Sequence, residues 1–118
     1  MTYFFDLDGT LMPHHKTEWL PQAKIMLDCL IREGNAVVFV TGRGPQDEGT
    51  AWSVSKTMAF LKQQQMTHIP ILYDMPAGRV IVDDRKPHAV WRDKNESWYM
   101  GRPDLPKNIG KNKKVEKI

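Results

Sequence analysis

The sequence predicts an α/β fold, a Rossmann-like three-layer α/β/α sandwich with a mostly parallel sheet. Two observations support this prediction. Short, continuous apolar runs recur along the chain, which is typical of strands buried on both faces of a sheet. Amphipathic segments of helical length separate the first run from the second and the second from the third. The 118 residues, of which 41% are hydrophobic and 26% charged, suffice for one globular core.

The first part of the chain reads as a strand, a helix and a second strand. The first strand is entered by Tyr3 and broken by a Gly-Thr pair at residues 9–10. Apolar residues at three- and four-residue spacing predict a helix over residues 19–32, and residues 36–40 form the next apolar strand. Strands joined in this way are parallel, and the connection between them is right-handed.

The second part predicts a helix over residues 51–65, short strands at 69–73 and 80–82, a short helix at 88–92 and a last strand at 97–100. Only residues 74–78 separate Tyr73 from Arg79, whereas a parallel crossover needs about a dozen residues or more. Either the strands at 69–73 and 80–82 form an antiparallel hairpin, or one of them is not a sheet strand.

We expect one domain over residues 1–101 and a basic, mobile tail over residues 102–118. Six Lys and Arg against two Asp and Glu follow residue 101, which leaves the first 101 residues at −1 out of a total net charge of +3. No apolar run has membrane-spanning length, and no leader segment precedes the first strand. The single cysteine, Cys29, is expected to be a buried thiol in a reducing, cytoplasmic environment.

Polar side chains follow three of the predicted strands. Asp6 and Asp8 stand two residues apart and therefore point the same way at the carboxyl end of the first strand. Thr41 follows the second strand, and Asp83 and Asp84 follow residues 80–82. Open α/β sheets bind ligands at this edge, and neighbouring carboxylates favour a cation or proton between them. A solvent-exposed acidic turn is the simpler interpretation of the first pair.

The runs FFDLDGTL, VVFVTGR and VIVDDR, in this order, resemble motifs one, two and four of the haloacid dehalogenase (HAD) superfamily. The resemblance implies a HAD-like phosphatase in which Asp6 is the nucleophile and forms an aspartyl-phosphate. Asp8 would be the general acid and base, and Thr41 would bind a phosphoryl oxygen. The implied cofactor is Mg²⁺, with Asp6, Asp8, Asp83 and Asp84 as candidate ligands.

Within the superfamily, the chain looks most similar to polynucleotide 3′-phosphatase domains. The matching residues are Gly42-Arg43, the Arg85 that follows the late acidic pair, and Trp91-Arg92. By this resemblance, Gly42, Arg43 and Arg85 contact the substrate, and the two arginines bind phosphate oxygens. For Trp91 we favour the alternative of an aromatic side chain anchored in the core.

The family's third motif, a lysine or arginine carried on a helix before the fourth strand, has no counterpart helix here. The cation must then come from elsewhere, and Lys86, beside the late acidic pair, and Lys56, early on the helix at 51–65, are the candidates. Each is otherwise an ordinary solvated lysine.

The chain has no room for a cap domain, so the resemblance implies an open site. Such a site favours a bulky phosphorylated partner such as a nucleic-acid end, or a neighbouring subunit that covers it. We therefore expect a Mg²⁺-dependent phosphomonoester hydrolase acting on nucleic-acid 3′-phosphates or nucleotides, without a membrane partner. The alternatives are a non-catalytic HAD-like module that binds phosphate, and a nucleic-acid binder acting through its basic tail.

Overall fold

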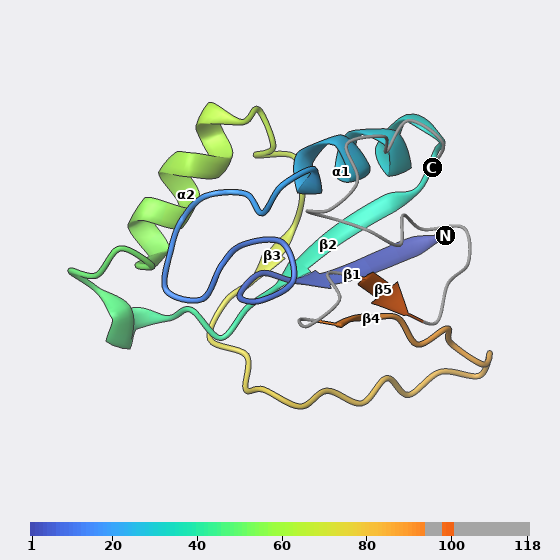
Figure 1. Cartoon of the computed structure of the whole chain (residues 1–118). Coiled ribbons are helices and arrows are strands. Elements are labelled where there is room, and N and C mark those ends of the chain that lie inside the picture. Colours follow the sequence, from blue (N-terminus) through green and yellow to red (C-terminus); the bar gives the residue numbers. More distant parts are fainter. Residues whose placement is uncertain (94–97, 101–118) are drawn as a thin grey trace.

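A computed structural model describes residues 1–93 and 98–100 of the chain. The central elements form a small α/β unit (Figure 1). They are β1 (Thr2–Asp6), α1 (Ala23–Arg32), β2 (Ala36–Val40), the 3₁₀ turn η1 (Pro45–Asp47), α2 (Val54–Gln63) and β3 (Ile71–Leu72), followed by β4 (Trp91–Asp93) and β5 (Trp98–Met100).

The strands β1, β2 and β3 form a parallel sheet in that order. Phe5 lies opposite Phe39, and Phe39 lies opposite Ile71, so the three strands share one register across the sheet. The predicted α/β class with a parallel sheet is confirmed. The apolar run at 69–73 is a parallel sheet strand, although only Ile71–Leu72 pairs with β2.

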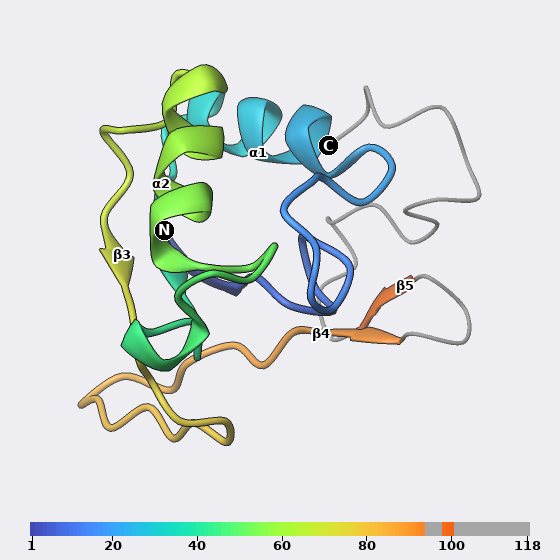
Figure 2. The same ribbon diagram turned by 90° about the vertical axis from the view of Figure 1, so that its left-hand side faces the viewer.

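Both helices lie on the same side of the sheet (Figure 1, Figure 2). Two crossovers of the same hand that move the chain in the same direction across a sheet place their helices on one face. Phe5 and Phe39 point into this layer and are buried against Leu27 and Leu30 of α1. Phe4 points the opposite way and is 55% exposed. The described residues thus form two layers, and the expected third layer is not seen among them.

The two helices begin later than their hydrophobic patterns predict. Trp19 belongs to the loop before α1, where its ring packs against Phe60 and its indole N–H donates to the Gln64 side chain at 3.0 Å. α2 begins at Val54 because the Ser53 hydroxyl accepts the Lys56 backbone N–H, an N-cap contact. No helix in the described residues is long and apolar enough to cross a membrane.

For the second part of the chain, the structure bears out the alternative that one of the runs at 69–73 and 80–82 is not a sheet strand, and it contradicts the predicted helix. Residues 80–82 form no strand, and Val80 and Val82 are 88% and 93% exposed, because residues 74–78 are too short to carry the chain back across the sheet. Residues 88–92 form no helix, since β4 begins at Trp91 and pairs antiparallel with β5. The Trp91 side chain is 58% exposed, so it is not a core residue either. The predicted last strand at 97–100 corresponds to β5.

We predict that Leu27→Ala lowers the free energy of unfolding by about 2–5 kcal/mol, because it removes a fully buried side chain between α1 and the sheet. The midpoint of urea denaturation measures this loss. Ile25→Ala on the solvent side of the same helix is the matched control and should change stability by about 0.5 kcal/mol or less. Equal losses in the two variants would contradict the described packing of α1.

Candidate active site

A tight turn follows β1 and presents the first two acidic residues. The Leu7 carbonyl accepts the backbone N–H groups of Thr10, Leu11 and Met12, which closes the turn. Gly9 has φ +80°, a conformation that glycine adopts without strain, and its N–H donates to the Met12 carbonyl at 2.7 Å. The turn thereby holds two carboxylates, one on each side of Leu7, at the carboxyl end of the sheet.

Asp6 is the more accessible of the two carboxylates, with 35% of its side chain exposed. Arg79 approaches it from the segment after β3, with 3.3 Å between Arg79 Nη1 and Asp6 Oδ1. Burial raises the pKa of Asp6 above its ordinary value; the Arg79 guanidinium opposes this shift, and the negative charge of Asp8 adds to it. Asp6 is therefore a partly desolvated carboxylate with a cation beside it.

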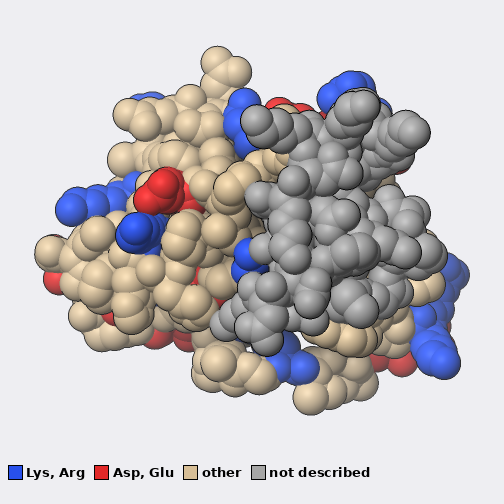
Figure 3. Space-filling model, in the orientation of Figure 1, with Lys and Arg blue, Asp and Glu red and all other residues tan. Residues whose placement is uncertain are grey.

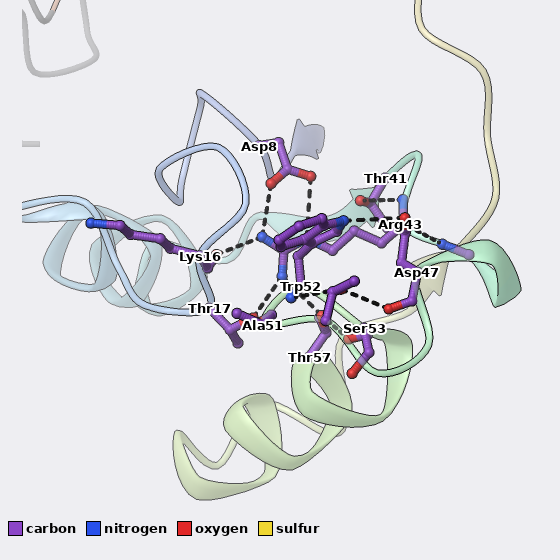
Figure 4. A network of polar contacts seen from close by, with 12 residues as sticks. Asp8, Lys16, Thr17, Thr41, Arg43, Asp47, Ala51, Trp52, Ser53 and Thr57 are labelled. Carbon is purple, nitrogen blue, oxygen red and sulfur yellow. Dashed lines mark hydrogen bonds and ion pairs between the residues drawn. The ribbon is translucent and has the colours of Figure 1, made fainter.

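Asp8 is held by a buried arginine (Figure 4). Arg43 donates from Nε to Asp8 Oδ2 at 3.2 Å and from Nη2 to Asp8 Oδ1 at 2.8 Å. Its remaining donors reach the hydroxyls of Thr17 and Thr57 and the Lys16 carbonyl, and only 1% of Arg43 is exposed. The sequence led us to expect Arg43 at a phosphate oxygen, whereas here its donors are engaged by acceptors of the protein.

Thr41 lies at the same edge, because it directly follows Val40, which is paired with Asp6. Thr41 is fully buried, and its hydroxyl oxygen accepts the Arg43 backbone N–H at 3.1 Å. The segment after β3 runs beside this turn. Its Met75 N–H donates to the Thr41 carbonyl, and a Cβ on Gly42 would stand 3.4 Å from the Met75 carbonyl oxygen. The structure thus gathers Asp6, Asp8, Thr41 and Gly42 at one edge.

The late acidic residues lie elsewhere. Asp83, Asp84 and Arg85 are exposed in the irregular segment that follows Arg79. The pKa of Asp83 is lowered, chiefly because its carboxylate accepts the Arg85 backbone N–H at 3.2 Å. These residues are not gathered with the pair on the turn after β1.

The described residues do not fit a magnesium site as they are arranged. Among them, no three His, Cys, Asp or Glu side chains come together in a group that could hold a metal ion. The two carboxylates that do come together, Asp6 and Asp8, each face a guanidinium group. Their negative charge is therefore already compensated within the protein.

Two arginines reach the site without having been assigned a role from the sequence. Arg79 pairs with Asp6, while the candidate lysines Lys56 and Lys86 are exposed and form no ion pair with a carboxylate of the described residues. Arg92 of β4 donates from Nη1 to the Gly9 carbonyl at 3.0 Å. Arg79 could have been found from its position just before residues 80–82, because the resemblance puts a lysine or arginine before that segment. It was not chosen because the helix that carries this residue in the family is missing here.

The family model for haloacid dehalogenase-like hydrolases matches residues 3–70, which is more than half of the chain. The matched stretch runs from β1 to the residue before β3 and contains Asp6, Asp8, Thr41 and Arg43. Comparison with curated proteins and with solved structures finds no match.

We predict that Asp6→Asn raises the free energy of unfolding at pH 7. The folded protein keeps the proton on Asp6 to a higher pH than the unfolded chain, so the charge that forms as pH rises through the folded pKa destabilises the folded state. The gain should be about 1 kcal/mol or less, because a third of the carboxylate is exposed and screened by solvent.

Chemical denaturation between pH 3 and pH 8 tests this, and the gain should shrink as pH falls and approach zero near about pH 3, below the ordinary aspartate pKa of about 3.9. Asp28→Asn on the exposed face of α1 is the control, and it should change the free energy of unfolding by only about 0.5 kcal/mol. A lower stability of Asp6→Asn than of the wild type at pH 7 would contradict the prediction.

Proposed function

Because the chain belongs to the family of haloacid dehalogenase-like hydrolases, we propose that it hydrolyses phosphomonoesters with Asp6 as the nucleophile. The observation that carries the proposal is the pair of carboxylates on the turn after β1, one accessible and one held rigidly. Asp6 is open to solvent on about a third of its side chain, whereas both oxygens of Asp8 are fixed by Arg43. A nucleophile must reach the substrate, and a proton donor must be held in place.

The proposed reaction has two steps. Asp8 first takes up the proton of a phosphomonoester that arrives as its monoanion. An oxygen of Asp6 then attacks phosphorus, the bond to the leaving oxygen breaks, and Asp8 gives that oxygen its proton. Asp8 then takes a proton from a water molecule, whose oxygen attacks the aspartyl-phosphate and releases inorganic phosphate and free Asp6. Thr41, at the same edge, is the proposed contact for a phosphoryl oxygen.

Arg79 is the proposed cation of the site. It already lies 3.3 Å from the nucleophile, and a guanidinium can bind a carboxylate and a phosphate oxygen together. This position supports Arg79 over the exposed Lys56 and Lys86. When a phosphate arrives, Arg79 would neutralise part of its charge, which would otherwise repel the Asp6 carboxylate.

The family relationship favours Mg²⁺ as the cofactor, and we propose its binding as a separate step of assembly. Asp83 or Asp84 would join Asp6 only if the segment after Arg79 moved toward β1. One feature supports such a movement. Val80 and Val82, which are β-branched and apolar, are exposed and lie close to Asp83 in the sequence. The two reaction steps above do not depend on this assembly.

A nucleic-acid 3′-phosphate or a nucleotide remains the proposed substrate. On the face shown in Figure 3, acidic and basic side chains are interspersed over the described residues rather than gathered into one basic track. The lysines of residues 102–118 are the proposed contacts for backbone phosphates, and Arg85 is the proposed contact for the phosphate end. A second subunit covering the open edge is the other proposed partner.

A non-catalytic phosphate-binding module is the competing function. One observation favours it: each carboxylate of the turn is paired with an arginine, so the two negative charges are neutralised within the protein without a metal ion or substrate. Turnover that depends on Asp6 separates the two functions.

We predict release of inorganic phosphate from a panel of 3′- and 5′-phosphorylated oligonucleotides, mononucleotides and sugar phosphates, measured with and without Mg²⁺. Asp6→Asn should abolish release, while Asp28→Asn on α1 should leave it unchanged. Asp83→Asn and Asp84→Asn should raise the Mg²⁺ concentration needed for half-maximal rate. Binding of phosphate without release from any substrate would support the non-catalytic module instead.

We predict that Arg79→Met lowers kcat/KM by about 10²–10³-fold, because removing one charged group that stabilises a transition state costs on this order. Lys56→Met and Lys86→Met are the matched controls and should change kcat/KM by less than about 3-fold, since solvated lysines contribute little. A large loss in either lysine variant together with a small loss in Arg79→Met would reverse the assignment.

A further inference from the structure

The most completely bonded side chain near the site is that of Arg43, whose guanidinium contacts Asp8 but none of the other groups that take part in the proposed steps. A guanidinium group has five N–H donors, and five contacts account for all of them. Two go to the Asp8 carboxylate, two to the hydroxyls of Thr17 and Thr57, and one to the Lys16 carbonyl at 2.6 Å. No donor is left for a substrate.

The two threonine hydroxyls are themselves fixed in orientation. The Thr57 hydroxyl donates to the Ser53 carbonyl at 2.8 Å, and the Thr17 hydroxyl donates to the Ala51 carbonyl at 2.6 Å. Each hydroxyl has one hydrogen, so each presents only lone pairs to Arg43. On the side of the guanidinium away from Asp8, Arg43 therefore donates to two hydroxyl oxygens that can act only as acceptors toward it.

The acceptors come from separate parts of the fold. Thr57 is buried in α2, Lys16 and Thr17 lie in the loop between β1 and α1, and Asp8 lies on the turn after β1. Arg43 itself follows β2, and its backbone N–H donates to the Thr41 hydroxyl. The planar guanidinium thus fixes Asp8 relative to β2 and α2 and not only to its own turn.

A buried arginine is costly unless every donor is satisfied and its charge is paired. The network meets both conditions with Arg43 at 1% exposure. A bidentate contact to both oxygens of a carboxylate also restricts the rotation of that group, which a single lysine ammonium does not do.

We infer that Arg43 is a positioning residue that fixes the Asp8 carboxylate for proton transfer, and that it does not bind substrate. The inference rests on the proposed function, in which Asp8 protonates the leaving oxygen. Proton transfer requires the donor to be within hydrogen-bond reach of that oxygen, so loss of this orientation should slow the steps that need a proton and spare those that do not.

The leaving group of the substrate tests this. A p-nitrophenolate leaves with little need of a proton, whereas an alkoxide such as that from glycerol phosphate requires one. Because Asp8 also acts in the second step, which is the same for both substrates, kcat/KM is the quantity to compare, since it reports the first step. Arg43→Lys should lower kcat/KM for glycerol phosphate by about 10²-fold or more, the usual contribution of general acid catalysis, and kcat/KM for p-nitrophenyl phosphate by less than about 10-fold. Arg32→Lys on the exposed face of α1 is the matched control and should leave both rates unchanged.

Thr57→Val gives a second measurement if Arg43→Lys fails to fold, as judged by circular dichroism and thermal unfolding. It keeps the contact with Asp8 and removes one hydrogen bond behind it, so the same preference should appear with a smaller loss, of about 3–10-fold for glycerol phosphate only. Equal losses for the two substrates would show a merely structural role, and a raised KM with unchanged kcat would show a substrate contact; either overturns the inference. A wild-type protein that hydrolyses neither these two substrates nor any member of the panel of oligonucleotides, mononucleotides and sugar phosphates overturns the proposed function itself.

Discussion

The ion pair between Arg43 and Asp8 is the interaction on which the arrangement of this edge depends. It connects the turn after β1 with β2, with the loop before α1 and with α2. These elements are also joined by the pairing of β1 with β2, by the hydrogen bonds that Thr17 and Trp19 donate, and by apolar packing. Removing one partner of such a pair leaves an uncompensated buried charge, which costs about 3–5 kcal/mol. The same contact therefore stabilises the fold and orients a reactive group.

The first part of the fold could be predicted because its local signals agree with one another. The apolar runs of β1 and β2, the helical spacing between them and the polar residues after each strand all indicate a parallel sheet with a site at its carboxyl edge. The prediction of Cys29 as a buried thiol rests on the same periodicity and is confirmed. The helix starts were predicted less well, since they depend on Ser53 as a cap and on Trp19 packing against Phe60, a contact distant in sequence.

The second part shows where local signals mislead. Val80, Ile81 and Val82 have every property of a strand except a partner, and a strand exists only through pairing. The role of Arg43 was misjudged for a similar reason. Its position after Thr41-Gly42 suggests a phosphate contact, but its acceptors come from segments up to 35 residues away in sequence, which no local pattern reveals. Arg79 was missed because the helix that carries the cation in the family has no counterpart here, so the cation was expected from Lys86 or Lys56.

The two ion pairs at this edge differ in their contact with solvent. Arg79 and Asp6 are each about one-third exposed, whereas Arg43 is enclosed by the protein. Dissolved ions screen exposed charges over a distance of about 8 Å at physiological ionic strength and affect enclosed pairs much less. Added salt should therefore loosen the partner of the nucleophile while the proton donor stays in place, so the ionic strength of the medium acts selectively on one half of the site.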